Sequence, residues 1–221
     1  LDNLRSSTVD RELKGVVLDL RDNGGGLLDQ AIAVVDHFVP EGAIVRTRGR
    51  QGALLDEVHA RPGGHWNKVP LVLLVNKASA SASEVVAGAL QDHGRALVVG
   101  ERTYGKGSVQ APFELGDGSV LKLTIALYYT PRDRLIQATG ITPDVLVGAK
   151  GAAYEDSHPE LEPERAHPQH LRPEAFGYAA SGDERDRSEA VAAAGDDLQL
   201  KVAVEHLQTI GRMSAGGGRR R

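Results

Sequence analysis

Residues 71–110 constrain the fold more than any other stretch, and they read LVLLVNKASASASEVVAGALQDHGRALVVGERTYGKGSVQ. The apolar run at residues 71–75 stops abruptly at Asn76, which is typical of a strand buried on both faces. Small residues follow, and then apolar residues at helical spacing. A second apolar run at residues 96–99 leads to Lys106, which stands between two glycines. The stretch therefore predicts a strand, a tight turn, a helix, another strand and a glycine-flanked loop.

Three serines alternate with alanines in the turn that precedes the predicted helix. Ser81 and Glu84 have the spacing of a capping box, which would make the serine a helix cap and nothing more. The turn could instead present one hydroxyl where the first helical N–H groups and the helix dipole favour negative charge. A serine nucleophile needs such a position, and it also needs a base. The turn alone leaves both interpretations open.

A second candidate loop follows the predicted strand at residues 15–20 and contains three successive glycines, Gly24, Gly25 and Gly26. Such a loop is either a flexible strand-to-helix turn or a backbone nest whose N–H groups could form an oxyanion hole. It lacks the spaced glycines of a dinucleotide-binding fingerprint and the Gly-Lys-Ser/Thr ending of a phosphate-binding loop. Nucleotide binding is therefore not expected.

The rest of the chain predicts two hairpins, a short strand and a C-terminal helix. Residues 43–50 and 53–60 form a hairpin whose charges suggest a solvated or edge position. Residues 108–115 and 119–129 form another through the Gly-Asp-Gly turn. One more short strand is expected within residues 137–147. We expect a folded core over residues 1–147, an extended or disordered Pro- and charge-rich segment at 148–195, a helix at 196–212 and a tail at 213–221.

Composition excludes several function classes. Lys and Arg number 26 against 30 for Asp and Glu, and no long basic face is present, so nucleic acid is not an expected partner. The absence of cysteine removes disulfides, thiolate nucleophiles and cysteine metal sites. His158, His167 and His170 are separated by prolines and lack carboxylate or cysteine companions at a ligand spacing. We expect neither a metal nor a cofactor.

Alternating strands and helices with polar loops at the strand ends predict an α/β layered domain with its site at the carboxyl ends of the strands. Three segments, LDLRDNGGG, SASASEVVAGALQDHGRALVVGERTYGKGSVQ and YYTPRDRLIQATGITPDV, occur in the order and spacing of one family. Together they resemble the carboxyl-terminal processing proteases, or tail-specific proteases, of the S41 serine peptidase family. The resemblance implies a crotonase- or Clp-protease-like core with flanking helices, a β-hairpin and a C-terminal helix.

The resemblance also implies roles for individual residues. The nucleophile falls on Ser81, the general base on Lys106, and the glutamine that assists the lysine on Gln110. Asp92 matches a supporting acidic position. The oxyanion donors would be the N–H of Ala82 and that of Gly25 or Gly26.

These roles are chemically coherent. A lysine acts as a base only as the neutral amine, which burial favours, and we expect the flanking glycines to permit such burial of Lys106. Gln110 could orient the amine without adding charge. A carboxylate beside the lysine would oppose neutrality, so we expect Asp92 to anchor the helix end or a loop. A Ser–His–Asp triad through His93 is not favoured, because a helix separates His93 from Ser81.

The family pattern implies further features that the residues themselves do not. Members carry an N-terminal PDZ domain and a first core strand that we do not find here, so we expect a PDZ domain in the parent chain. Gly24 stands where members usually have proline, which should loosen the loop. The implied substrates are unfolded or C-terminally tailed proteins, the implied location is the periplasm or cell envelope, and pairing with another copy is a further expectation.

Two other functions stay open at the level of sequence. One is a catalytically silent module of the same fold that binds peptides or apolar ligands. The other is an acyl-CoA enzyme that uses the glycine loop as an oxyanion hole, a reading that rests only on architecture.

Overall fold

The computed structural model describes residues 13–63, 66–148, 162–172, 174 and 197–216. Strands and helices alternate through the first half of the chain, and hairpins follow, so the predicted α/β class is confirmed. In chain order the elements are β1 (Val16–Asp19), α2 (Leu28–Asp36), β2 (Ala43–Arg48), η1 (Arg50–Gly52), β3 (Leu54–His59), β4 (Leu71–Val75), α3 (Ala82–Asp92), β5 (Leu97–Gly100), β6 (Ser108–Glu114), β7 (Val120–Tyr129), β8 (Val145–Leu146), η2 (Glu164–Ala166) and α5 (Leu198–Gly216).

The first sheet is parallel and has the order β1-β4-β5-β8 within the described residues. All five residues of β4 are buried, as its apolar run predicts. Strand β1 lies at the edge of the sheet that the described residues form, although a continuous apolar run is typical of a central strand. Its apolar continuity has another cause, because Val16 and Leu18 pack into one core while Val17 packs into the other.

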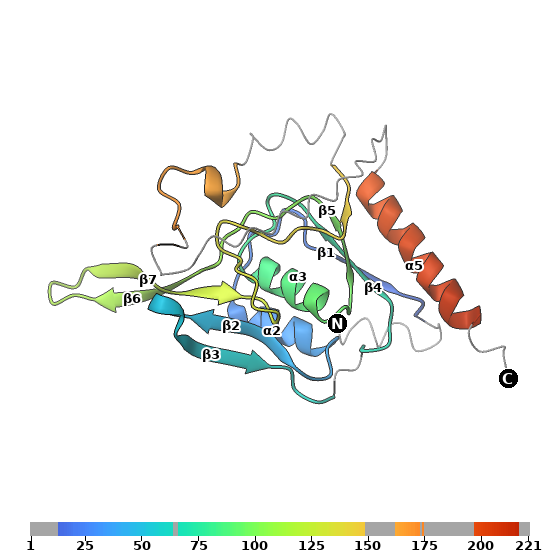
Figure 1. Cartoon of the computed structure of the whole chain (residues 1–221), viewed down its shortest axis with the longest axis horizontal. Coiled ribbons are helices and arrows are strands. Elements are labelled where there is room, and N and C mark those ends of the chain that lie inside the picture. Colours follow the sequence, from blue (N-terminus) through green and yellow to red (C-terminus); the bar gives the residue numbers. More distant parts are fainter. Residues whose placement is uncertain (1–12, 64–65, 149–161, 173, 175–196, 217–221) are drawn as a thin grey trace.

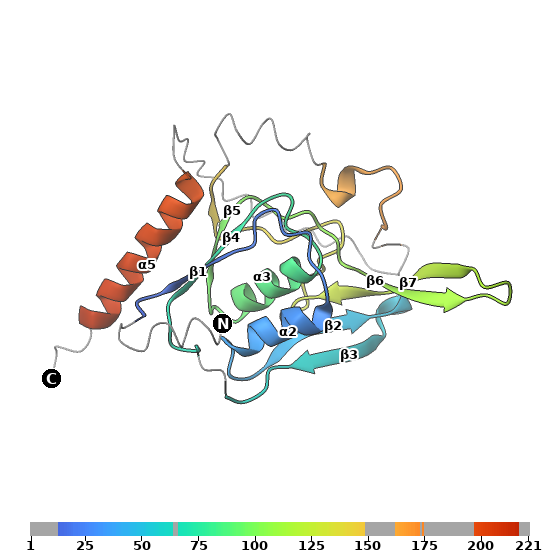
Figure 2. The same cartoon turned by 180° about the vertical axis from the view of Figure 1, so that it is seen from behind.

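The two cores lie on opposite faces of the parallel sheet. The larger core packs α2 and α3 between this sheet and β2, and the smaller core packs α5 against the other face. Figures 1 and 2 show α5 on one side of β1, β4 and β5, and α2 and α3 on the opposite side. This layering aims the loops at the carboxyl ends of β1, β4 and β5 toward one edge of the molecule, where both candidate loops begin.

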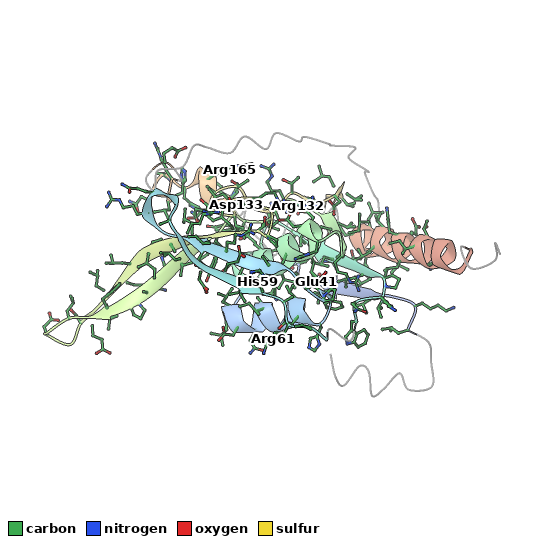
Figure 3. All side chains as sticks on the ribbon, turned by 60° about the horizontal axis from the view of Figure 1, so that its bottom comes forward. Glu41, His59, Arg61, Arg132, Asp133 and Arg165 are labelled. Carbon is green, nitrogen blue, oxygen red and sulfur yellow. The ribbon has the colours of Figure 1, made fainter. Side chains whose placement is uncertain are left out.

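The second sheet is antiparallel, with the order β3-β2-β7-β6. It joins both predicted hairpins, because β2 pairs with β7 as well as with β3. Arg48 of β2 forms an ion pair with Asp133, which is labelled in Figure 3, and this pair ties the sheet to the turn after β7. His59, also labelled there, is exposed at the end of β3. The β6–β7 hairpin extends away from the body of the molecule (Figure 1).

The C-terminal region differs from the sequence-based prediction. Helix α5 runs to Gly216, so residues 213–216 continue the helix that was expected to end at 212. Residues 162–172 were expected to be extended or disordered, yet they contain η2, and the N–H of Glu164 donates to the carbonyl of Tyr104 at 3.0 Å. Most of the remaining predicted extended segment lies outside the described residues, as do residues 1–12. No helix among the described residues is long and apolar enough to cross a membrane.

Candidate active site

The serine turn, residues 76–81, brings Ser81 to the point where β4 has ended and α3 begins. Ser81 has φ 57° and ψ −118°, a backbone conformation that non-glycine residues rarely adopt. Holding a residue in such a region costs about 1–3 kcal/mol, and strained positions of this kind concentrate at functional sites. A sharp strand-to-helix turn is also how hydrolases expose a nucleophilic serine. Ser81 is half-buried in this strained strand-to-helix turn.

The glycine loop, residues 22–26, packs directly against the serine turn. Gly25 has φ +96°, and a Cβ added there would lie 2.7 Å from the carbonyl oxygen of Ala80 and 2.8 Å from the nitrogen of Ala82. Both are backbone atoms, so no larger residue fits without moving the loop or the turn. Gly25 therefore lets the glycine loop pack backbone to backbone against the serine turn.

The donors predicted for an oxyanion hole differ in availability. The N–H of Gly25 donates to Oδ1 of Asn23 at 3.0 Å, so it is already engaged. Among the hydrogen bonds of the described residues, none uses the N–H of Ala82 or that of Gly26. Of the predicted pair, Gly26 is therefore the better partner for Ala82.

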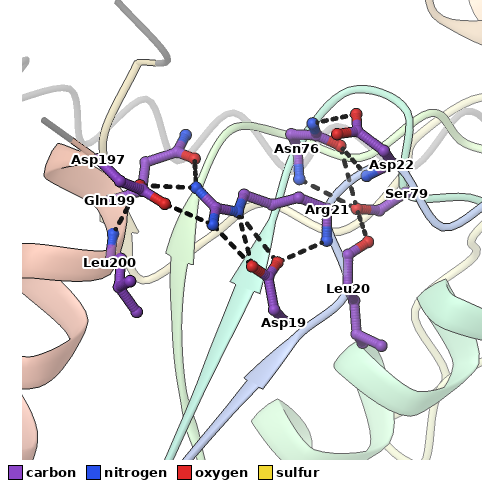
Figure 4. Close-up of polar contacts among 9 residues, drawn as sticks. All are labelled: Asp19, Leu20, Arg21, Asp22, Asn76, Ser79, Asp197, Gln199 and Leu200. Carbon is purple, nitrogen blue, oxygen red and sulfur yellow. Dashed lines mark hydrogen bonds and ion pairs between the residues drawn. The ribbon is translucent and has the colours of Figure 1, made fainter.

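Buried polar side chains join the two loops (Figure 4). Asn76 accepts the N–H of Asp22 at 3.0 Å through Oδ1, and its Nδ2 donates to the Asp22 carboxylate at 2.8 Å. Ser79 donates from Oγ to the carbonyl of Leu20 at 2.7 Å. The N–H of Ala80 donates to the carbonyl of Asn23. These bonds fix the glycine loop to the serine turn.

Glu84 holds the serine turn to the lysine loop, residues 101–107. Its fully buried carboxylate accepts the N–H of Ser81 and that of Lys106 at 2.8 Å each through Oε2. Oε1 accepts the N–H of Gly105 at 2.7 Å and the hydroxyl of Thr103. Burial raises the pKa of the Glu84 carboxyl, and these four donors oppose that shift. The glutamate half of the predicted capping box is confirmed by its bond to the N–H of Ser81, and the same glutamate also positions a second loop.

The glycines on either side of Lys106 are required by packing. A Cβ on Gly107 would lie 2.4 Å from the backbone nitrogen of Gln137, and Gly105 has φ +96° against the backbone at residues 138–140. The buried side chain of Gln137 accepts the N–H of Gly107 at 2.9 Å. The lysine loop is therefore clamped between α3 and the segment after β7.

Lys106 itself is exposed, so the predicted burial of its side chain is wrong for the described residues. The backbone explains the difference. Gly105 and Gly107 are buried against neighbouring backbone, and Lys106 between them faces outward. Gln110 is also exposed, and it lies in β6 opposite Thr124.

Asp92 has the anchoring role that its charge predicted. Its buried carboxylate accepts the backbone N–H of Arg132 at 2.8 Å and pairs with the guanidinium of Arg134 at 2.5 Å. His93 lies beyond the C-terminal end of α3, and its Nε2 bonds to the carbonyl of Ala43 at 2.7 Å. A triad through His93 is therefore not supported, because Ser81 stands at the other end of that helix.

Neither Glu84 nor Gln137 was assigned this junction role from sequence. Glu84 had a signal, since its spacing from Ser81 marked a cap, but nothing local indicated its contacts with residues 103–106. Gln137 had no sequence signal that could have indicated its bond to the lysine loop. Within the part of the chain that the structure describes, no group of His, Asp and Glu could hold a metal ion.

The fold and the site define an α/β protein that presents a strained serine beside a glycine loop, as serine hydrolases do. Comparison with known proteins makes this specific. The model for peptidase family S41 matches residues 1–147, and the chain belongs to that family.

Curated relatives and a solved structure agree with this assignment. The chain is 51% identical over 147 residues to a carboxy-terminal-processing protease of Bartonella bacilliformis, covering 66% of this chain and 34% of the relative. It is 45% identical over 154 residues to a carboxyl-terminal-processing protease of a Picosynechococcus strain, covering 70% and 36%. The solved photosystem II D1 C-terminal processing protease superposes with a TM-score of 0.60 at 42% identity, covering 65% of this chain and 36% of that one. The chain thus spans about a third of the length of these relatives.

Proposed function

We propose that the protein is a serine endopeptidase that cleaves protein substrates near their C-termini, with Ser81 as nucleophile and Lys106 as general base. The observation that carries the proposal is the strained Ser81 turn packed against Gly25. Membership of peptidase family S41 and the names of the relatives support the reaction and the substrate class.

In the proposed reaction, Ser81 Oγ attacks the scissile carbonyl carbon while its proton passes to the neutral amine of Lys106. The resulting oxyanion accepts the N–H of Ala82 and that of Gly26. The intermediate then collapses, and the C–N bond breaks as the lysine returns the proton to the leaving amine. Water, deprotonated by the same lysine, hydrolyses the acyl-enzyme and restores the serine. No metal or cofactor takes part.

Because Lys106 is exposed, the proposed mechanism needs the substrate to shield its side chain from water. A neutral lysine is favoured only away from water, and the described residues leave this side chain exposed. We propose that the bound substrate chain covers Lys106, with Gln110 on the adjoining strand orienting the amine. Placement in the periplasm or cell envelope, a PDZ domain in the parent chain and homo-oligomer formation stay predictions from family resemblance.

A cleavage assay tests the function. The protein is incubated with a disordered polypeptide that ends in apolar residues, and products are followed by mass spectrometry. Ser81→Ala and Lys106→Ala should each abolish cleavage, while Lys122→Ala, an exposed lysine on β7, should cleave like wild type. If either site variant cleaves as fast as wild type, the assignment is wrong. If no version cleaves, the silent binding module becomes the better account.

A further inference from the structure

Helix α5 lies outside residues 1–147, which the family model matches, yet its start contacts Arg21, the residue before the glycine loop. The helix packs Ala203 and its neighbours against the face of the parallel sheet opposite α3. Figure 4 shows the side chain of Arg21 reaching from the end of β1 to Asp197 and Gln199 at the start of the helix. The contact between them centres on Arg21, which immediately precedes Asp22.

Arg21 is held by three side chains. Its Nε donates to Asp19 at 3.0 Å, and its Nη2 donates to Asp19 at 2.6 Å and to Asp197 at 2.7 Å. Its Nη1 donates to the other oxygen of Asp197 at 2.7 Å and to Oε1 of Gln199 at 3.1 Å. All five N–H donors of the guanidinium thus have acceptors, and Asp197 binds both terminal nitrogens in the fork geometry that carboxylates favour.

Asp197 combines this ion pair with a second task. The same Oδ1 that accepts from Arg21 also accepts the N–H of Leu200 at 3.0 Å, so Asp197 caps the N-terminus of α5. Hydrogen bonding to Arg21 lowers the pKa of the Asp197 carboxyl. Gln199 is buried, and its Nε2 donates to the carbonyl of Val147 at 2.8 Å. The bond to Leu200 holds the carboxylate of Asp197 at the start of the helix. Asp197 and Gln199 together then hold the guanidinium of Arg21.

Arg21 is joined by one peptide bond to Asp22, the first residue of the glycine loop. Asp22 has φ 58°, and its N–H and carboxylate both bond to the buried Asn76. Asn76 in turn donates its N–H to Oγ of Ser79, two residues before Ser81. Arg21 therefore sets where the glycine loop leaves β1, and the loop's far side is already fixed to the serine turn.

We infer that Asp197 and Gln199 of α5 are positioning residues that act through Arg21 to hold the glycine loop in the geometry needed to bind the oxyanion. The inference rests on the proposed function for its catalytic consequence, whereas the structural coupling it describes is independent of any reaction. It makes a helix outside the matched region part of the machinery.

The decisive variant is Asp197→Asn. Asparagine caps a helix as well as aspartate, so α5 keeps its start, but the amide offers Arg21 one acceptor in place of two and no charge. Glu205→Gln is the matched control, because it removes one carboxylate from an exposed position of the same helix. Helix content by circular dichroism establishes that both variants fold.

Two measurements on the whole protein separate the coupling from the chemistry. The first is amide hydrogen exchange in the peptide that contains residues 21–26, followed without substrate. The second is steady-state cleavage of the disordered polypeptide. Asp197→Asn should speed exchange in that peptide at least about threefold and lower kcat about three- to tenfold with KM little changed, since the lost interaction serves the transition state. Glu205→Gln should change neither.

A double-mutant cycle with Arg21→Lys shows whether the effect passes through the arginine. Lysine keeps the charge but cannot fork between carboxylates, so the two substitutions together should cost less than the sum of their separate effects on exchange. Unchanged exchange in Asp197→Asn, or strictly additive effects in the cycle, would overturn the inference. If exchange responds as expected while even the wild type cleaves nothing, the proposed function fails and the coupling stands.

Discussion

Replacing Glu84 by glutamine should destabilise the protein, although the change removes a buried charge. Glutamine has nearly the same shape, but one of its two ends donates where both carboxylate oxygens accept. Placed at Oε2, the amide nitrogen would meet the N–H of Ser81 and that of Lys106. Placed at Oε1, it would meet the N–H of Gly105 and the hydroxyl of Thr103. The second placement is better, because a hydroxyl can rotate and accept.

The second placement still leaves the buried N–H of Gly105 without an acceptor. An unsatisfied buried donor costs about 1–3 kcal/mol, so we expect the free energy of unfolding to fall by about that amount. Urea denaturation of wild type and Glu84→Gln at neutral pH measures the difference. The rate at which a fluorophosphonate reagent modifies Ser81 should fall as well, because the serine turn and the lysine loop lose their shared anchor.

The pH dependence of the same pair checks the physical reason. Because burial raises the pKa of Glu84 in the folded state, this group contributes stability that is fully present below its unfolded pKa. That contribution is lost as the pH rises through the folded pKa. As the pH rises from the unfolded to the folded pKa of Glu84, the free energy of unfolding of wild type should therefore fall relative to that of Glu84→Gln. A variant as stable as wild type at neutral pH, with the same pH profile, would refute the junction role of Glu84.

Three further predictions follow from the site. Gly107→Ala should lower the free energy of unfolding by about 2 kcal/mol or more, since its Cβ would strike backbone at Gln137; Gly116→Ala, with nothing within 4 Å, should change it by less than about 0.5 kcal/mol in the same urea titration. Ser81→Gly should be about 1 kcal/mol more stable than Ser81→Ala by thermal unfolding, because only glycine relieves the positive φ; equal stabilities would mean that the turn is unstrained. Arg21 lowers the pKa of Asp197, so wild type should be more stable than Asp197→Asn at neutral pH, and this difference should vanish as the pH falls through that lowered pKa. Unfolding free energies of both proteins, measured across an acid titration, would differ by a constant amount if the ion pair contributed nothing.

Local sequence predicted those parts of the site that depend on neighbours along the chain. The turn at Ser81 and the glycines at 25 and 107 were foreseeable, because small residues after a buried strand have few other uses. The junction at Glu84 was only half foreseeable. Its bond to the N–H of Ser81 is local, whereas its bonds to residues 103–106 depend on how the loop after β5 folds back over α3.

The remaining features depend on contacts between distant segments. The pairing of β2 with β7 joins residues about eighty apart in sequence, and neither strand's pattern specifies its partner. The exposure of Lys106 was missed because flanking glycines indicate a close backbone approach but not the direction of the side chain between them. Asp197 was predicted only as a helix start, and its ion pair with Arg21 spans most of the chain.

The central claim is that Ser81 is a nucleophile activated by Lys106. A fluorophosphonate reagent tests it directly, because phosphonylation requires an activated serine hydroxyl and no knowledge of the natural substrate. Intact-mass and peptide mass spectrometry should show one adduct on Ser81 in wild type and no adduct in Lys106→Ala. An unmodified Ser81 in wild type, or equal labelling of Lys106→Ala, would contradict the claim.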